Sequence, residues 1–143
     1  MRGAPLLESD RVLYRAIDED FAANLMTGDS FVDRAFVSTS EGFENILNPG
    51  YVHPEDRWVL EIRVPAGTRA LNMVDVVSRM TSHPDYPKAL RLARDEKEWV
   101  LPRGLRFQVT SRGDVRVPGR HMYDTDEEYH PPERTLRLEV LSS

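Results

Sequence analysis

Cysteine is absent from this 143-residue sequence. Its absence excludes disulfide bonds, thiol nucleophiles and thiolate metal sites. The four histidines do not show metal-ligand spacing, so we expect them to be surface residues. No apolar run reaches the length of a signal-peptide core or of a membrane span. We therefore expect no membrane association and, by default, a cytoplasmic chain.

Basic charge is also scarce. The chain has 19 Lys and Arg residues against 24 Asp and Glu residues, which gives a net charge of −5 and a pI of about 5.4. This balance argues against a protein that holds a nucleic-acid scaffold through bulk positive charge. A small anionic ligand, bound by a few local arginines, is compatible with it.

What is present predicts one folded domain over residues 1–143. Hydrophobic residues make up 40% of the chain and charged residues 30%, which is typical of globular proteins. The patterning predicts strands over 11–16, 34–40, 58–67, 105–110 and 134–141, a further strand from Glu98, helices over 17–28 and 86–96, a turn-rich loop over 41–57, and a long hairpin or mobile loop over 111–133. Residues 71–80 fit neither pattern clearly. Strands outnumber helices and do not alternate with them regularly, so we predict a mixed α+β fold rather than a doubly wound parallel sheet.

The alternation within each strand predicts which side chains form the core. The inward-facing residues are expected to be Leu60, Ile62 and Val64 in one strand, Leu105, Phe107 and Val109 in the next, and Leu136, Leu138 and Val140 in the last. In the first strand, Tyr14 and Ala16 share one face and Leu13 and Arg15 the other.

Two glutamates, Glu96 and Glu98, stand on either side of Lys97 at the start of a strand-like run. Side chains at positions i and i+2 of a strand point to the same face, so a strand that begins by Glu96 places both carboxylates together. A solvated helix end is the simpler explanation, because charge runs are common there. Two neighbouring anions otherwise need a functional reason.

The other motifs along the chain supply that reason. Tyr14-Arg15 lies in the first strand, Phe36-Val37-Ser38-Thr39-Ser40 in the second, "LEIRVPAG" follows at 60–67, and "EKEWVLPRG" at 96–104 leads into an alternating strand. In this order, the series resembles the mono-ADP-ribosyltransferases of the Arg-Ser-Glu type that carry a Glu-x-Glu motif. The resemblance covers residues 12–109 and suggests a bacterial toxin, an effector or a phage enzyme that can be delivered into a host cell.

The resemblance implies a fold and an activity. The fold would be two packed antiparallel or mixed β-sheets that form an NAD cleft, with a few short helices. The activity would be transfer of ADP-ribose from NAD to a protein arginine with release of nicotinamide, without a metal. Glu98 would stabilise the cationic ribose in the transition state. Glu96 would orient the guanidinium of the acceptor and help to remove its proton.

The same resemblance assigns roles to residues of the first two strands. Arg15 would grip the NAD pyrophosphate or a nearby ribose. Ser38 would hydrogen-bond Glu98 and hold it in place. Tyr14, Ala16 and Thr39 would complete the NAD site, although Thr39 and its neighbour Ser40 are equally suited to capping the following turn.

The loop over 41–57 corresponds to one that covers the phosphates and nicotinamide in the family. Phe43, Tyr51 and Arg57 are therefore predicted ligand contacts. For the two aromatic residues, anchoring of the loop to the core is an equally good explanation.

Two departures from the family pattern keep other functions open. Ala16 replaces a glycine that usually follows the motif arginine, and only 13 residues precede Tyr14 where the family has a helical region. We therefore expect either a compact catalytic core or a fragment of a longer protein. The alternatives are an NAD glycohydrolase, with water as acceptor, and a catalytically silent binding or structural module that retains the fold.

Overall fold

Strands dominate the structure, a computed structural model that describes residues 4–47, 52–115 and 133–142. The elements are β1 (Arg11–Asp18), α1 (Glu19–Ala22), β2 (Ser30–Asp33), β3 (Val37–Ser40), the 3₁₀ helix η1 (Phe43–Leu47), β4 (Arg57–Val64), β5 (Leu71–Asn72), α2 (Met73–Ser78), α3 (Tyr86–Glu96), β6 (Glu98–Leu101), β7 (Leu105–Val115) and β8 (Glu133–Ser142). The predicted mixed α+β fold is confirmed.

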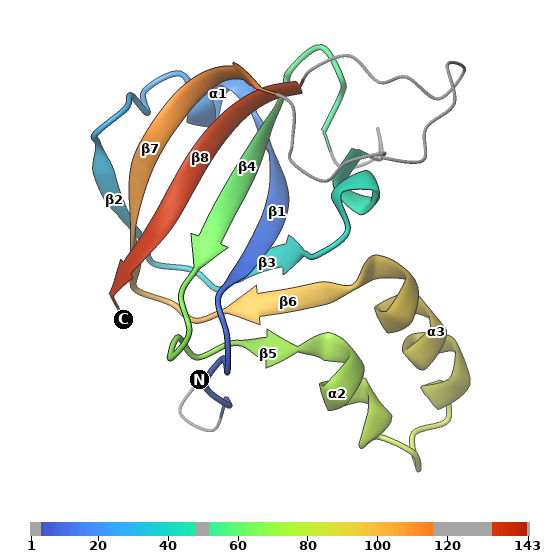
Figure 1. The fold of residues 1–143 in the computed structure, drawn as a ribbon. Coiled ribbons are helices and arrows are strands. Elements are labelled where there is room, and N and C mark those ends of the chain that lie inside the picture. Colours follow the sequence, from blue (N-terminus) through green and yellow to red (C-terminus); the bar gives the residue numbers. More distant parts are fainter. Residues whose placement is uncertain (1–3, 48–51, 116–132, 143) are drawn as a thin grey trace.

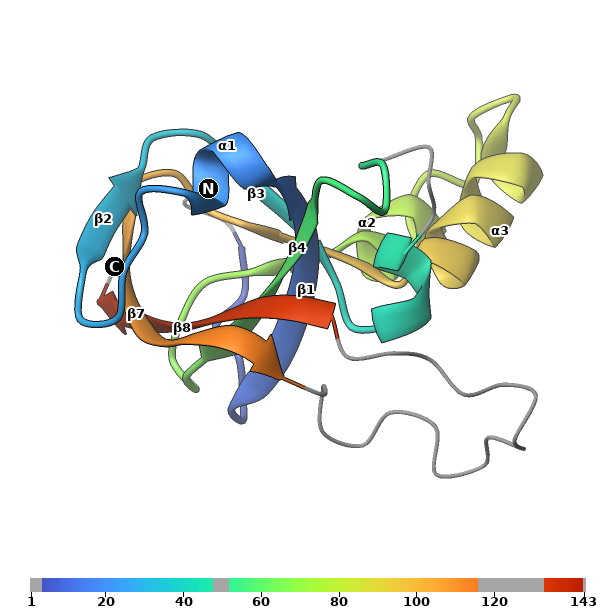
Figure 2. The same ribbon diagram turned by 90° about the horizontal axis from the view of Figure 1, so that it is seen from above.

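The eight strands form one sheet in the order β2-β7-β8-β4-β1-β3-β6-β5, in which only β4 and β8 run parallel. Strands β2, β7, β8, β4 and β1 curve around one half of the molecule, and β3, β6 and β5 cross beneath them (Figures 1 and 2). We expected two packed sheets. Instead, the pair Tyr14 and Ser40 joins the two halves, because β1 hydrogen-bonds to β4 on one edge and to β3 on the other.

The main core lies on the concave side of the curved strands. All nine residues predicted to face inward in β4, β7 and β8 are at most 4% exposed, which confirms the alternation argument. The cluster also includes Leu13 of β1 and Leu101 of β6. Side chains from both halves of the sheet therefore share one core.

A second, smaller cluster lies on the opposite face of β1 and β4. It consists of Tyr14, Phe43, Ile46 and Val59, and we call it the outer cluster. Phe43 and Ile46 come from η1, so this cluster fixes η1 to the outside of the sheet. It also explains why β4 buries residues on both of its faces.

The helix predicted over 17–28 is much shorter in the structure. It begins at Glu19, two residues later than expected, where the Asp18 side chain accepts a hydrogen bond from the Phe21 N–H at 2.9 Å, and it ends at Ala22. Beyond that point the Leu25 carbonyl accepts a hydrogen bond from Arg112 of β7 at 3.0 Å. Arg112, which is distant in the sequence, thus donates to a carbonyl that would accept a backbone N–H bond if the helix continued.

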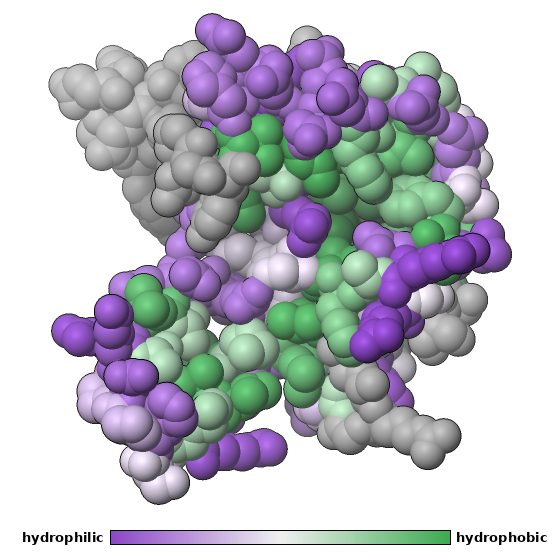
Figure 3. Space-filling view, turned by 180° about the vertical axis from the view of Figure 1, so that it is seen from behind, coloured by the Kyte–Doolittle hydropathy of each residue, from purple (hydrophilic) through white to green (hydrophobic). Residues whose placement is uncertain are grey.

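Strand β2 was missed in the sequence, whereas the helix predicted over 86–96 has the bounds of α3. The ambiguous segment 71–80 contains β5 and α2. Helices α2 and α3 form a lobe, and seen from behind the surface is hollowed between this lobe and the rest of the molecule (Figure 3). Among the described helices, none is long and apolar enough to cross a membrane.

Candidate functional site

A cleft of about 380 Å³ opens where β1, β3, η1, β6 and the end of α3 meet. All four residues that were predicted to be catalytic line this cleft, namely Arg15, Ser38, Glu96 and Glu98. The lining residues are Tyr14, Arg15, Ala16, Ser38, Thr39, Ser40, Asn45, Ile46, Val52, Glu96 and Glu98. The fold therefore brings together residues that lie as far apart in the sequence as Tyr14 and Glu98.

The pairing of β3 with β6 places Ser38 beside Glu98. Ser38 is opposite Val100 and Ser40 is opposite Glu98, so Ser38 and Glu98 are diagonal neighbours on one face of the sheet. The Ser38 hydroxyl donates a hydrogen bond to Oε2 of Glu98. This contact fixes the direction of a carboxylate that is only half-buried.

Arg15 is held against β3. Its Nη1 donates a hydrogen bond to the Ser38 carbonyl at 2.8 Å. A guanidinium carries several N–H donors in a rigid fork, so one contact can anchor it while others face a ligand. Arg15 thus brings a permanent positive charge to the edge of a cleft that also contains two carboxylates.

Glu96 reaches the cleft by a different route from the one we expected. It is the last residue of α3, and the strand begins only at Glu98. Between them Lys97 has left-handed backbone angles, with φ 51° and ψ 43°. This turn, rather than an i and i+2 relation along a strand, brings both carboxylates to the cleft.

Thr39 and Ser40 are both buried, and each ties β3 to the segment that carries the glutamates. The Thr39 hydroxyl donates to the Trp99 carbonyl at 2.8 Å, and the Ser40 hydroxyl donates to the Glu96 carbonyl at 2.7 Å. Ser40 also accepts a hydrogen bond from the Gly42 N–H at 3.0 Å. Both hydroxyls therefore form hydrogen bonds that hold this wall of the cleft together.

Tyr14 forms part of the cleft and of the outer cluster at once. Its ring meets Phe43 edge to face, with centroids 5.6 Å apart. Burial, reinforced by the nearby Glu61 carboxylate, raises the pKa of the Tyr14 phenol to about 12. Phe43 is 6% exposed and does not line the cleft, so its position in the structure is that of an anchor for η1.

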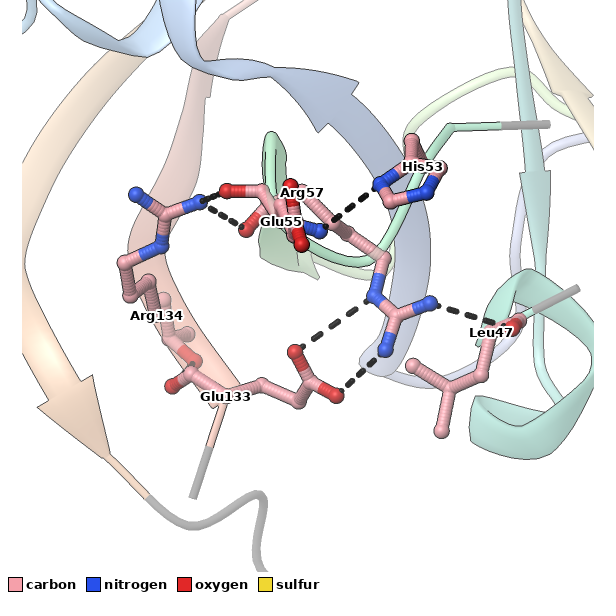
Figure 4. A network of polar contacts seen from close by, with 7 residues as sticks. Leu47, His53, Glu55, Arg57, Glu133 and Arg134 are labelled. Atoms are coloured by element: carbon pink, nitrogen blue, oxygen red, sulfur yellow. Dashed lines mark hydrogen bonds and ion pairs between the residues drawn. The ribbon is translucent and has the colours of Figure 1, made fainter. Parts of the chain in front are cut away.

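Arg57, a predicted ligand contact, is instead engaged in a buried ion pair (Figure 4). Its Nη2 lies 2.6 Å from Oε1 of Glu133, and its Nη1 donates to the Leu47 carbonyl at 3.0 Å. The side chains of Arg57 and Glu133 are 8% and 15% exposed. Tyr51, the other loop residue predicted to bind ligand, lies outside the described residues.

A second cavity of about 350 Å³ adjoins the cleft and shares Arg15, Ala16 and Val52 with it. Most of its other lining residues are apolar and belong to the main core, including Leu60 and Phe107. No group of three or more His, Asp or Glu residues that could hold a metal ion occurs in 4–47, 52–115 or 133–142.

Asn45, Ile46 and Val52 line the cleft but were not predicted to do so. All three lie in the 41–57 loop, whose length was the available signal. Which side of η1 faces the cleft depends on the packing of Phe43 and Ile46 against β1 and β4, and this packing is not visible in the local sequence.

No protein-family model matches the sequence, and no curated protein is significantly similar to it. Solved structures are similar in fold. Plx2a, an ADP-ribosyltransferase toxin from Paenibacillus larvae, superimposes with a TM-score of 0.58 at 17% identity, over 96% of this chain and 64% of that one. C3stau2 from S. aureus, solved with NAD, gives 0.58 at 13% identity, over 95% and 64%.

Vis toxin, an ADP-ribosyltransferase from Vibrio splendidus, gives a TM-score of 0.53 at 17% identity, over 96% of this chain and 51% of that one. It has also been solved in complex with agmatine. The chain thus spans about half to two thirds of the length of the structures that it matches. This protein has the fold of the ADP-ribosyltransferase toxins.

Proposed function

We propose that this protein is a mono-ADP-ribosyltransferase that uses NAD as co-substrate and modifies protein arginine. The observation that carries the proposal is the cleft, which gathers Arg15, Ser38, Glu96 and Glu98 in a fold shared with ADP-ribosyltransferase toxins. These four residues were also predicted from the motif order, so the motifs and the geometry support the same site.

Glu98 suits the chemistry of breaking the bond between nicotinamide and ribose. As this bond breaks, positive charge develops on the ribose, and a carboxylate held nearby lowers the energy of that state. The hydrogen bond from Ser38 supports this role because it holds one oxygen of a carboxylate that lines the cleft. Arg15, anchored on the Ser38 carbonyl, would neutralise the pyrophosphate of NAD.

Glu96 suits the acceptor side of the reaction. Glu96 is exposed, whereas Glu98 is half-buried, so an incoming protein can reach Glu96 from solvent. A carboxylate pairs with a guanidinium through two parallel hydrogen bonds, which orients the attacking nitrogen and provides a base for its proton. In the reaction, the bond between nicotinamide and the ribose carbon breaks and a bond from the guanidinium nitrogen to that carbon forms. Nicotinamide and one proton are released.

We predict that Glu98→Gln and Glu96→Gln have different effects. Glu98→Gln should lower both ADP-ribosyl transfer and NAD cleavage by about 100-fold or more, because the ribose cation loses its counter-charge. Glu96→Gln should lower transfer to arginine by about 100-fold but retain NAD cleavage by water. The measurement is incubation with labelled NAD and a cell lysate, with nicotinamide release, free ADP-ribose and modified residues quantified by mass spectrometry.

Glu8→Gln is the matched control, because Glu8 is exposed and does not line the cleft. It should behave as the wild type. Free ADP-ribose as the sole product of the wild type would instead assign the chain as an NAD glycohydrolase. If the wild type releases no nicotinamide at micromolar enzyme, the chain is a silent module and the proposal is wrong.

A further inference from the structure

The last turn of α3 is clamped by residues 40–45, a segment that runs from the end of β3 into η1. Three consecutive carbonyls at this helix end, those of Asp95, Glu96 and Lys97, each accept a hydrogen bond from that segment. The donors are, in turn, the Asn45 side-chain amide, the Ser40 hydroxyl at 2.7 Å and the Glu41 N–H at 3.2 Å. The backbone on both sides of the Glu96 side chain is thereby fixed.

These donors matter because negative charge accumulates at this end of α3. The end of a helix has unpaired carbonyls and a partial negative charge, and Glu96 adds a full negative charge at the same point. Donors that satisfy the carbonyls offset this unfavourable arrangement. Among these donors, Asn45 comes from η1, and it also lines the cleft.

Asn45 is well placed for this task because η1 is held at two further points. The Leu47 carbonyl at its end accepts a hydrogen bond from the buried Arg57, and Phe43 packs in the outer cluster. Gly42 leaves the space that the Asn45 amide occupies, since a Cβ atom at position 42 would lie 2.1 Å from its Oδ1. The Asn45 side chain is therefore confined between Gly42 and the end of α3.

We propose that Asn45 is a positioning residue that sets where Glu96 meets the acceptor. It acts through the Asp95 carbonyl and the backbone of the helix end, and Gly42 provides the space that this contact requires. The inference rests on the proposed function and adds to it a residue that controls the partition between transfer to a guanidine and hydrolysis by water. Disturbing Asn45 displaces Glu96 and leaves the Arg15, Ser38 and Glu98 group in place.

The test measures this partition in purified variants of the 143-residue chain, with agmatine as a small guanidine acceptor. Asn45→Asp removes the donor and adds a negative charge beside Glu96. It should lower kcat/KM for agmatine about 10-fold or more, because small errors in placing reacting groups are costly. Asn45→Ala should have a smaller effect in the same direction. In both variants the ratio of agmatine product to free ADP-ribose should fall, because Glu96 is displaced whereas Glu98 keeps its hydrogen bond from Ser38.

Gly42→Ala gives a second variant in which Asn45 is retained but displaced, and it should show the same selective loss. Asn24→Asp is the matched control, since Asn24 is exposed and does not line the cleft, and it should leave the product ratio unchanged. If Asn45→Asp and Gly42→Ala keep the wild-type ratio of agmatine product to free ADP-ribose, or lower both products equally, the inference is wrong. A wild type without any nicotinamide release would refute the proposed function instead.

Discussion

At the scale of single residues, Tyr14 has an electrostatic property that solution experiments can detect. Its phenol is buried beside the carboxylate of Glu61, and both effects favour the neutral form. In the unfolded chain the phenol has an ordinary pKa of about 10, whereas in the folded chain the pKa is about 12. The unfolded state therefore loses its proton first as the pH rises.

This difference predicts how stability depends on alkaline pH. The contribution of Tyr14 should be complete below a pH of about 10 and should decline as the pH rises towards about 12, because the unfolded state then binds fewer protons than the folded state. Urea unfolding midpoints measured across this range should fall less steeply in Tyr14→Phe than in the wild type. Equal slopes for Tyr14→Phe and the wild type would contradict the assignment.

The residues that were predicted best for the site are those on strands. Arg15, Ser38 and Glu98 lie on β1, β3 and β6, where alternation determines the face that each side chain occupies. For Glu96 the helix predicted over 86–96 was correct, but the strand relation expected to bring its carboxylate beside that of Glu98 was not. The reason is the left-handed conformation of Lys97, which no composition rule predicts, since lysine seldom adopts it.

At the scale of elements, the start of β4 is joined to η1 and β8 by the Arg57 and Glu133 pair (Figure 4). The partners are 76 residues apart in the sequence. Local patterning cannot predict such a contact, and Arg57 was accordingly expected in the ligand site. Its position shows that a loop arginine can be structural when a distant strand supplies a carboxylate.

Breaking this pair should be costly because a buried guanidinium would lose its counter-charge. Glu133→Gln is expected to lower the free energy of unfolding by about 3 kcal/mol. Glu19→Gln, which removes the 57% exposed partner of Arg134, should cost less than about 1 kcal/mol. Urea denaturation of both variants provides the comparison. Similar losses in the two variants would show that the Arg57 pair is not special.

At the scale of the whole molecule, both halves of the sheet contribute to one main core. The sequence contains two tryptophans, and the structure places Trp58 on β4 in one half and Trp99 on β6 in the other. Both belong to the main core. The two residues are therefore natural reporters of whether the halves unfold together.

We predict a single unfolding transition that both tryptophans report. Trp58→Phe leaves Trp99 as the reporter, and Trp99→Phe leaves Trp58. Adding Leu101→Ala, at a residue with no exposed surface, should destabilise both single-tryptophan proteins by the same amount, about 3 kcal/mol. Fluorescence-detected urea unfolding measures the shift. A shift in the Trp99 signal alone would mean that the halves unfold separately.

The fold class was predictable because strand alternation defines buried faces, and nine inward-facing residues were identified correctly. The joining of the two halves into one sheet was not predictable. It depends on the pairing of Tyr14 with Ser40, and pairing between strands that are distant in the sequence leaves no periodic signal in either of them. The short α1 has the same kind of cause, because Arg112 of β7 helps to end it.

The turn at Lys97 gives the one-residue spacing of the two glutamates a geometric meaning. Glu96 belongs to an element with a rotation of about 100° per residue, and Glu98 to an element with a rotation of about 180°. The two carboxylates therefore line the same cleft because the turn at Lys97, the joint between helix and strand, sets the orientation of α3 relative to β6. One residue added before the joint would rotate the first carboxylate around the helix axis, and one added after it would turn the second to the back of the sheet.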